Sequence, residues 1–150
     1  MTRASVVLWV VLAGCRGSGK TPASPHRMEL RRLSGDTVSF VPAPGQLPYC
    51  LIYTISARGV TRQITMTRGQ QSVPCPAGVP VMGLAYRIPL DEGRVKAYSF
   101  FSDHRLTAAA VSEQLVEIGD SPTLSPMNLR LPGQVVLDVE EFNPSTPGAL

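Results

Sequence analysis

The chain has 150 residues, enough for one domain or for a smaller domain with a leader and a tail. Apolar residues make up 43% and charged residues 17%, a balance that suits a globular core and excludes a wholly disordered chain. The net charge of +3 becomes +2 without a leader carrying Arg3, because 13 basic and 11 acidic residues then remain. That balance is too even to favour nucleic acid as a partner.

The first fifteen residues have the form of a secretory leader. A basic start, Met1-Thr-Arg3, precedes an apolar run over residues 6–13. This run is shorter than the ~20 residues of a membrane-spanning helix, so it predicts a signal peptide over residues 1–14. The motif that ends it, Leu12-Ala13-Gly14-Cys15, resembles the lipobox of bacterial lipoproteins.

The resemblance to lipoproteins implies both a modification and a location. In that family the cysteine thiol receives a diacylglycerol, which here would be the thiol of Cys15, and the leader is cut just before it. Arg16 stands where an Asp would retain such a protein at the inner membrane, so the resemblance implies the outer membrane of the bacterial cell envelope. Residues 15–26 are rich in Gly, Ser and Pro, and we expect a flexible tether there.

The same stretch also matches a phosphate-binding loop. Gly14, Gly19, Lys20 and Thr21 satisfy G-x-x-x-x-G-K-[ST]. Such a loop must pass directly into a helix whose first amides face the phosphates, and Pro25 would break the first turns of that helix. We therefore interpret the match as chance, and a nucleotide-binding protein is the least favoured function.

Residues 27–142 predict a β-rich domain of short strands separated by turn residues. The expected strands cover residues 28–33, 37–41, 49–55, 60–66, 84–88, 94–101 and 134–142. The first two flank a hairpin turn at Ser34-Gly35-Asp36, and 49–55 and 60–66 should pair antiparallel. The segment 73–78 is punctuated by prolines and is unsuited to a central strand.

The last expected strand alternates along its length. Its apolar face carries Val135, Leu137 and Val139, and its other face carries Asp138 and Glu140. Residues 134–141 also resemble the end of a strand that binds magnesium, but the alternation of apolar and acidic residues favours an ordinary strand. After it, we expect a disordered tail over residues 143–150.

One amphipathic helix interrupts the strands, near residues 104–118. The residues that indicate it are Ala108, Val111, Leu115 and Ile118 at helical spacing, Ser102 or Asp103 as the first cap, and Gly119 as the end. The predicted fold class is mainly β, an antiparallel sheet or sandwich with this one helix, and the alternative is α+β.

Few residues in the domain have the pattern of a catalytic or metal site. Ser102-Asp103-His104 contains the residue types of a hydrolase triad, but consecutive side chains diverge where a triad must converge. A single histidine, His104, predicts no metal site and is expected to be an exposed residue near the helix start. We expect Asp91-Glu92 to be a turn and Glu140-Glu141 a strand end near the surface. The sequence thus predicts no catalytic residue and no cofactor.

Cys50 and Cys75 remain once Cys15 is assigned to lipid. In an oxidising compartment they can close a loop of ~25 residues, which the chain-entropy estimate values at roughly 3 kcal/mol. We predict a disulfide between them. The alternative is a buried free Cys50 and an unpaired Cys75.

Several short motifs between residues 47 and 110 resemble a bacterial envelope-associated domain family of unknown function. These motifs are Tyr49-Cys-Leu-Ile-Tyr53, Arg58-Gly59-Val60, Pro76-Ala77-Gly78 and the strand that closes in Ser102-Asp103-His104-Arg105-Leu106. The two cysteines depart from the pattern of that family. The resemblance implies a β-rich fold and an envelope setting, and it brings no catalytic residues.

Together these features predict a lipid-anchored envelope protein with a non-catalytic binding or structural domain. The expected partners are the membrane, through the lipid, and another envelope protein, with no nucleic acid. The alternative from another class is a hydrolase that acts on envelope polymers through Asp103 and His104.

Overall fold

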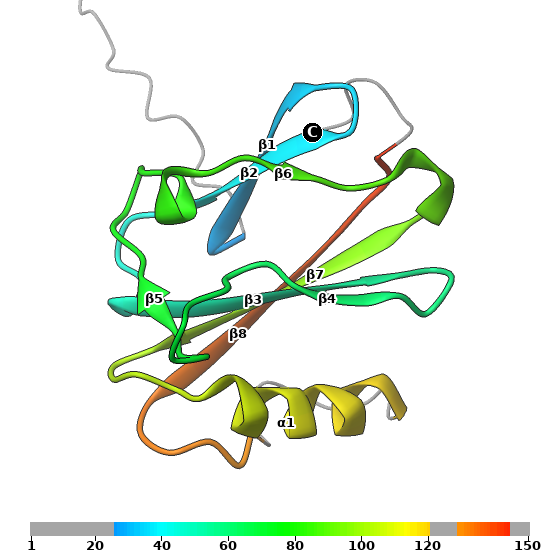
Figure 1. Ribbon diagram of the computed structural model, residues 1–150. Helices are drawn as coiled ribbons and strands as arrows, with labels where there is room; N and C mark the ends of the chain where they lie inside the picture. Colours follow the sequence, from blue (N-terminus) through cyan, green and yellow to red (C-terminus); the bar gives the residue numbers. More distant parts are fainter. Residues whose placement is uncertain (1–25, 121–128, 145–150) are drawn as a thin grey trace, which may run out of the picture.

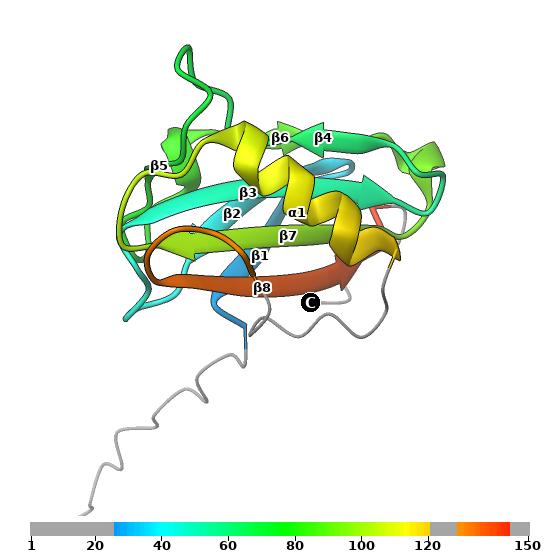
Figure 2. The same cartoon turned by 90° about the horizontal axis from the view of Figure 1, so that it is seen from below.

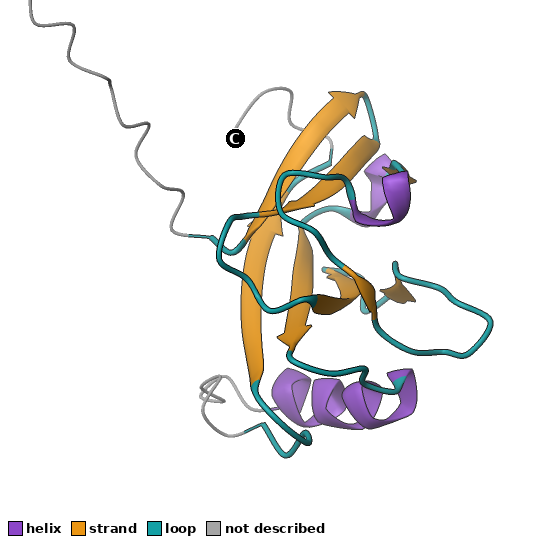
Figure 3. Ribbon diagram, turned by 90° about the vertical axis from the view of Figure 1, so that its left-hand side faces the viewer, coloured by secondary structure: helices purple, strands orange, loops and turns teal. Residues whose placement is uncertain are grey.

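The computed structural model of the chain describes residues 26–120 and 129–144. They form two antiparallel sheets and one helix stacked in three layers, with the larger sheet in the middle (Figures 1 and 3). The predicted class, mainly β with one helix, is confirmed. The signal peptide, the lipobox, the phosphate-loop match and most of the predicted tail lie outside the described residues.

The smaller sheet has the order β1-β2-β6, and the larger has the order β4-β3-β7-β8 with β5 also paired to β3. The elements are β1 (Met28–Ser34), β2 (Thr37–Pro42), β3 (Tyr49–Ser56), β4 (Thr61–Gln63), β5 (Val73–Pro74), η1 (Val81–Gly83), β6 (Tyr86–Arg87), η2 (Leu90–Glu92), β7 (Val95–Ser102), α1 (Ala108–Asp120) and β8 (Val135–Phe142).

The central pair β3–β7 is buried on both faces. The two strands pair antiparallel along their whole length, from Tyr49↔Ser102 to Ser56↔Val95. Because side chains alternate across a strand, one set faces the smaller sheet and the other faces α1. Figure 2 shows α1 lying across this second face. The long apolar runs of both strands are therefore explained by two separate core layers.

The two core layers divide the apolar residues of the domain cleanly. Between the sheets lie Met28, Leu30, Val38, Phe40, Cys50, Ile52, Ile64, Val73, Cys75, Val81, Ile88, Val95, Ala97, Phe101 and Phe142. Between the larger sheet and α1 lie Leu51, Tyr53, Tyr98, Phe100, Leu106, Ala108, Val111, Leu115 and Leu137. Each large side chain buried in this way contributes about 1.5–3 kcal/mol. All strand pairings and both layers fall within residues 28–142, so this part contains the complete described fold.

The β1–β2 hairpin forms at the predicted turn. Met28 to Pro42 pair in antiparallel register across it. Gly35 has a φ of +50°, a conformation that glycine adopts without the steric cost of a Cβ. The predicted hairpin is confirmed.

The strand predicted over residues 60–66 is shorter than expected. It ends at Gln63 because the next two residues turn inward against β3. The amide of Ile64 donates to the carbonyl of Ile52 at 2.8 Å, and the amide of Ile52 donates to the hydroxyl of Thr65 at 3.1 Å. The Thr65 hydroxyl, fully buried, thus replaces a backbone acceptor at this point of the sheet.

The strand predicted over residues 84–88 is also shorter, reduced to Tyr86–Arg87. The two residues before Leu84 have left-handed backbone, with φ values of 57° at Met82 and 67° at Gly83. Pro89 follows Ile88 and has no amide to extend the ladder. The strand is confined between a turn and a proline.

The helix begins at Ala108 rather than near residue 104. The hydroxyl of Thr107 accepts a hydrogen bond from the amide of Ala110 at 3.4 Å, as an N-terminal cap does. Ser102 and Asp103, the predicted caps, are wrong for this role because both are bonded elsewhere (below). The helix runs to residue 120, one residue past the predicted end at 119.

Side chains join β1 to β8 where the edges of the two sheets meet. A carboxylate oxygen of Asp138 accepts hydrogen bonds from the amides of Arg27 and Met28, at 2.7 and 2.9 Å. Farther along, the Arg32 guanidinium donates to the carbonyls of residues 143 and 144, at 2.6 and 2.9 Å. These hydrogen bonds hold the two sheets together along one side of the sandwich, although β1 and β8 do not pair as strands.

Glu140 lies on the inward face of β8, on the same side as Asp138. Glu141 is exposed, and Glu140 beside it is half-buried with its side chain turned inward. The Oε2 atom of Glu140 is buried without a hydrogen-bond partner in the described part of the chain. Burial raises the pKa of this carboxyl above 4.5; His26 opposes the shift, and Asp138 and Glu29 add to it.

The Glu140→Gln substitution is expected to raise the melting temperature at about pH 8 and to leave it unchanged at about pH 3.5. A carboxyl whose folded pKa is raised destabilises the fold as pH rises above the unfolded pKa, and the loss is complete above the folded pKa. Thermal melts followed by circular dichroism at the two pH values measure the effect. Glu141→Gln, at an exposed site beside Glu140, is the control and should give no gain. A lower melting temperature for Glu140→Gln at the higher pH would contradict the prediction.

Candidate functional site

The two cysteines of the domain form a disulfide. Cys50 and Cys75 are bonded, with their Cα atoms 5.7 Å apart, and their exposed fractions are 0% and 4%. The bond lies in the core layer between the sheets. The predicted pairing is confirmed, and the alternative of two free thiols is wrong.

The disulfide secures a segment that has little regular structure. Next to it, β5 pairs with only the first two residues of β3, Tyr49 and Cys50. The amide of Cys75 donates to the carbonyl of Pro48 at 2.9 Å. The expectation that residues 73–78 cannot form a central strand is consistent with this two-residue edge strand. The covalent bond holds the connector where a longer ladder is absent.

Asp103 and His104 lie side by side and connect β7 to the start of β8. The Oδ1 atom of Asp103 lies 2.5 Å from Nδ1 of His104 and accepts a hydrogen bond from the amide of Gln134 at 3.1 Å. The bond with His104 holds the pKa of the Asp103 carboxyl below its usual range. Ser102 does not join them, because its hydroxyl is turned to donate to the carbonyl of His104 at 2.7 Å.

The turn before β8 fits closely around this pair. Gly133 has a φ of +69°, and a Cβ at this position would lie 2.1 Å from the Cε1 atom of His104. Only glycine fits here, for conformation and for space. The turn covers part of His104, but its side chain is still 41% exposed, as expected. Its expected place at the helix start is wrong, because the helix begins at Ala108.

The acidic pair of the predicted turn at residues 91–93 has two different surroundings. Asp91 forms an exposed ion pair with Arg58 at 2.9 Å. Glu92 is buried, and one of its oxygens accepts a hydrogen bond from the Arg62 guanidinium at 2.6 Å. Both residues lie in the 3₁₀ turn η2, which Gly93 ends with a φ of 68°. Each carboxylate therefore secures a neighbouring segment.

A pocket of about 520 Å³ opens on the α1 side of the larger sheet, where β3 ends and β7 begins. It is lined by Ile55, Ser56, Ala57, Arg94, Lys96, Tyr98 and Glu141. Arg94 is 3.2 Å from Glu141, and burial followed by the charge of Glu141 raises the pKa of the Tyr98 hydroxyl. Lys96 has no ion pair in the described residues. The pocket combines apolar side chains with two cations, one carboxylate and two hydroxyls, which suits a polar ligand.

Sequence reasoning missed this pocket. Its lining comes from the ends of three strands, and only the register of β3 with β7 and of β7 with β8 brings them together. One signal was present, because Arg94, Lys96 and Tyr98 alternate with apolar residues and so share one face. The helix α1 does not cover the part of that face where Arg94 and Lys96 lie. No sequence pattern indicates where the helix leaves the sheet uncovered.

Within residues 26–120 and 129–144, no group of three or more His, Cys, Asp or Glu side chains is placed to hold a metal ion. In the same ranges, no helix has the length and apolar character needed to cross a membrane. Cys15, Gly14, Gly19, Lys20 and Thr21 lie outside the described residues.

Comparisons with known proteins give no match. No protein family, no curated protein and no solved structure is similar to the chain at a significant level. The resemblance to lipoproteins and to an envelope-associated family therefore stays a prediction.

Reduction of the Cys50–Cys75 bond is expected to lower the melting temperature on the order of 10 °C. The loop of 25 residues corresponds to about 3 kcal/mol of unfolded-state entropy. Melting curves with and without a reductant measure the change, and Cys50→Ala with Cys75→Ala in one chain is the matched control. The reductant should have no effect on that variant. Equal melting of the native chain with and without reductant would contradict the prediction.

Proposed function

We propose that the protein is a lipid-anchored component of the bacterial cell envelope whose β-rich domain acts by binding or as a structural module, without catalysis. The observation that carries the proposal is the disulfide buried in the core. Disulfides form and persist in oxidising compartments and are rare in the cytosol. A domain built around one matures after export.

Export agrees with the character of the leader. The chain has three cysteines, and two of them are used inside the domain. Cys15 is the remaining cysteine, and it stands at the end of an apolar leader in the lipobox Leu12-Ala13-Gly14-Cys15. Arg16 in place of Asp supports the outer membrane as the destination.

The positions of the polar residues support binding over catalysis. Asp103 and His104 connect β7 to the turn before β8, and Asp138 holds the start of β1. Asp91 and Glu92 each bind an arginine. Residues that would be candidates for acid–base chemistry thus have roles in joining segments. The pocket beside Lys96 offers a place for a ligand, and its volume lies in the range of small-molecule sites.

The Cys15→Ser substitution is expected to abolish lipid attachment. In cells labelled with a radioactive or clickable fatty acid, the native chain should carry label and the variant should carry none. The variant should also keep its leader, because the lipoprotein peptidase acts after lipid attachment. Gel mobility and mass spectrometry of the purified protein measure both effects.

Lys20→Ala is the matched control, five residues from Cys15. It should leave labelling unchanged, and neither chain should bind ATP at micromolar concentration. Equal labelling of Cys15→Ser and the native chain would overturn the anchor. ATP binding that Lys20→Ala removes would overturn the function as a whole.

A further inference from the structure

Several loops meet at the end of the sandwich where the chain enters the domain. The amide of Ala43 donates to the carbonyl of Arg27 at 2.9 Å, which places the loop after β2 beside the entry point. The amide of Gly78 donates to the carbonyl of Pro42 at 2.8 Å, which adds the segment leading into η1. Segments 43–48 and 76–84 are thus neighbours of the entry point.

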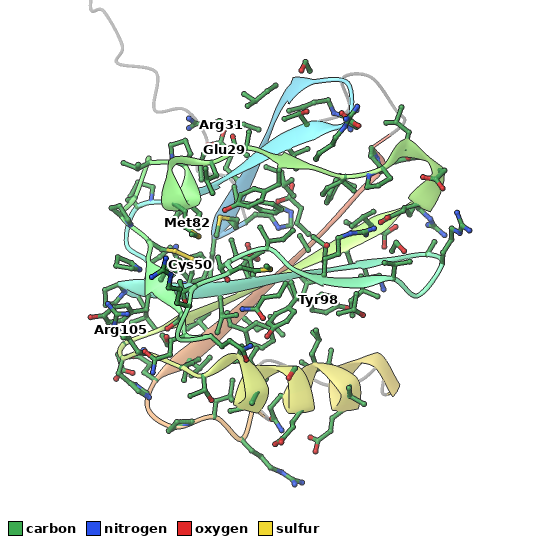
Figure 4. The ribbon with its side chains drawn as sticks, viewed as in Figure 1. Glu29, Arg31, Cys50, Met82, Tyr98 and Arg105 are labelled. Carbon is green, nitrogen blue, oxygen red and sulfur yellow. A yellow bond between two sulfur atoms is a disulfide. The ribbon has the colours of Figure 1, made fainter. Side chains whose placement is uncertain are left out.

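The loop between β4 and β5 joins the same end through the start of α1. Ser72 donates its amide to the carbonyl of Leu106 at 2.8 Å, and Ala108 donates to Gln70 at 2.7 Å. The guanidinium of Arg105 lies 5.5 Å from the ring centre of Tyr49, which begins β3. Figure 4 shows Met82, Cys50 and Arg105 at one end of the molecule. We call Arg27 with segments 43–48, 66–71, 76–84 and 103–107 the tether end.

Apolar side chains project from the tether end. Val79, Met82 and Leu84 are 48%, 43% and 48% exposed, and Met66 is more exposed still. Single exposed apolar residues are common, but these three lie within six residues of one turn.

The turn η1 holds these side chains outward. Val81 is fully buried, and its carbonyl accepts hydrogen bonds from the Tyr86 hydroxyl at 3.3 Å and from the amide of Leu84 at 3.2 Å. Met82 has a φ of 57°, an uncommon conformation for a residue with a side chain. The fold therefore keeps an apolar side chain exposed at a backbone position that glycine or asparagine fits better.

Basic side chains outnumber acidic ones at the tether end. Arg27, Arg68 and Arg105 form no ion pair in the described part of the chain, and Asp103, the one acid in these segments, is bound to His104. Of the seven described arginines elsewhere, five are paired with acids: Arg31–Glu29, Arg58–Asp91, Arg62–Glu92, Arg87–Asp36 and Arg94–Glu141. Of the other two, Arg32 donates to backbone carbonyls and Arg130 forms no ion pair in the described residues. With Asp138, whose carboxylate accepts a hydrogen bond from the amide of Arg27, three arginines and two acids leave a formal charge of +1 at this end. An anionic surface complements it.

We infer that the tether end lies against an anionic lipid bilayer, with Val79 and Met82 at the boundary of headgroups and acyl chains and the three arginines at the headgroup phosphates. The inference rests on the proposed lipid anchor for its orientation. The twelve residues from Cys15 to Arg27 reach at most about 40 Å, and they join the domain at this end. A lipid chain together with a basic, partly apolar surface gives two membrane signals that reinforce each other.

The first test measures vesicle binding without the anchor. A chain beginning at Arg16 lacks Cys15 and retains residues 28–142, which contain the complete described fold. In cosedimentation it should bind vesicles of phosphatidylcholine with about 30% phosphatidylglycerol more than vesicles of phosphatidylcholine alone. Binding should fall in about 0.5 M salt, because salt screens charges at the surface.

Matched substitutions locate the surface. Met82→Asn with Arg68→Gln removes one apolar and one basic side chain of the tether end, and asparagine tolerates the left-handed backbone. The partition coefficient should fall at least about fivefold, the effect of one basic residue near an anionic membrane. Leu90→Asn with Arg58→Gln is the control, because both side chains are exposed and lie outside the tether end and outside the pocket. It should bind as the native chain does.

A fluorescence experiment reports insertion directly. The single tryptophan of the protein is residue 9, so the chain beginning at Arg16 contains none. Val79→Trp and Leu90→Trp each introduce one, at sites that are 48% and 49% exposed. Emission of the first should shift to shorter wavelength with anionic vesicles, and emission of the second should not.

Three results would overturn the inference. They are absence of binding to anionic vesicles, equal binding by the tether-end variant and the native chain, and an equal shift for both tryptophans. Capture of a soluble protein through Met82 without vesicle binding would also overturn it, in favour of a protein partner. The vesicle experiment uses a protein without Cys15, which therefore carries no lipid. Its failure is thus distinct from a failure of Cys15 labelling.

Discussion

The arrangement of this domain depends on the burial of both faces of the β3–β7 pair. The strands pair over eight residues each, and their alternating side chains are apolar on both sides. Such a sheet is stable in water only when something covers each face. The β1–β2–β6 sheet covers one face and α1 covers the other. The remaining loops then gather at the two ends of the sandwich.

The disulfide and the ion pairs secure the opposite ends by different means. At the tether end, Cys75 is bonded to Cys50 and the connector continues to Val81, which is buried in the same layer. At the far end, Arg62 reaches the buried Glu92 and Arg58 reaches Asp91. The arginines of the tether end form no ion pair in the described residues; Arg27 donates to the side chain of Gln46, and Arg105 lies over the ring of Tyr49.

The sequence predicted what depends on periodicity and composition. Alternation located β3, β7 and β8, the apolar face of α1 was visible at helical spacing, and the two cysteines were paired by elimination. The features that the sequence did not predict depend on the register between strands and on side chains that accept hydrogen bonds from backbone amides. Thr65 ends β4 by accepting a bond from Ile52. Asp103 binds the amide of Gln134, 31 residues away, instead of capping the helix. Neither partner can be identified from local sequence, and the pocket beside Lys96 has the same origin.

The turn at Met82 is the part of the fold on which the proposed membrane contact depends most directly. A glycine or an asparagine would relieve its backbone, and a polar side chain would suit its exposure, yet the residue is a methionine between Val81, which is buried, and Gly83. Stability of the domain alone accounts for Val81 and Gly83, because one fills the core and the other permits the turn. It does not account for an apolar side chain at position 82 with apolar neighbours at 79 and 84. The proposed membrane contact would account for this exposed apolar surface beside arginines that form no ion pair in the described residues, because the proposed lipid anchor precedes the point of chain entry at Arg27.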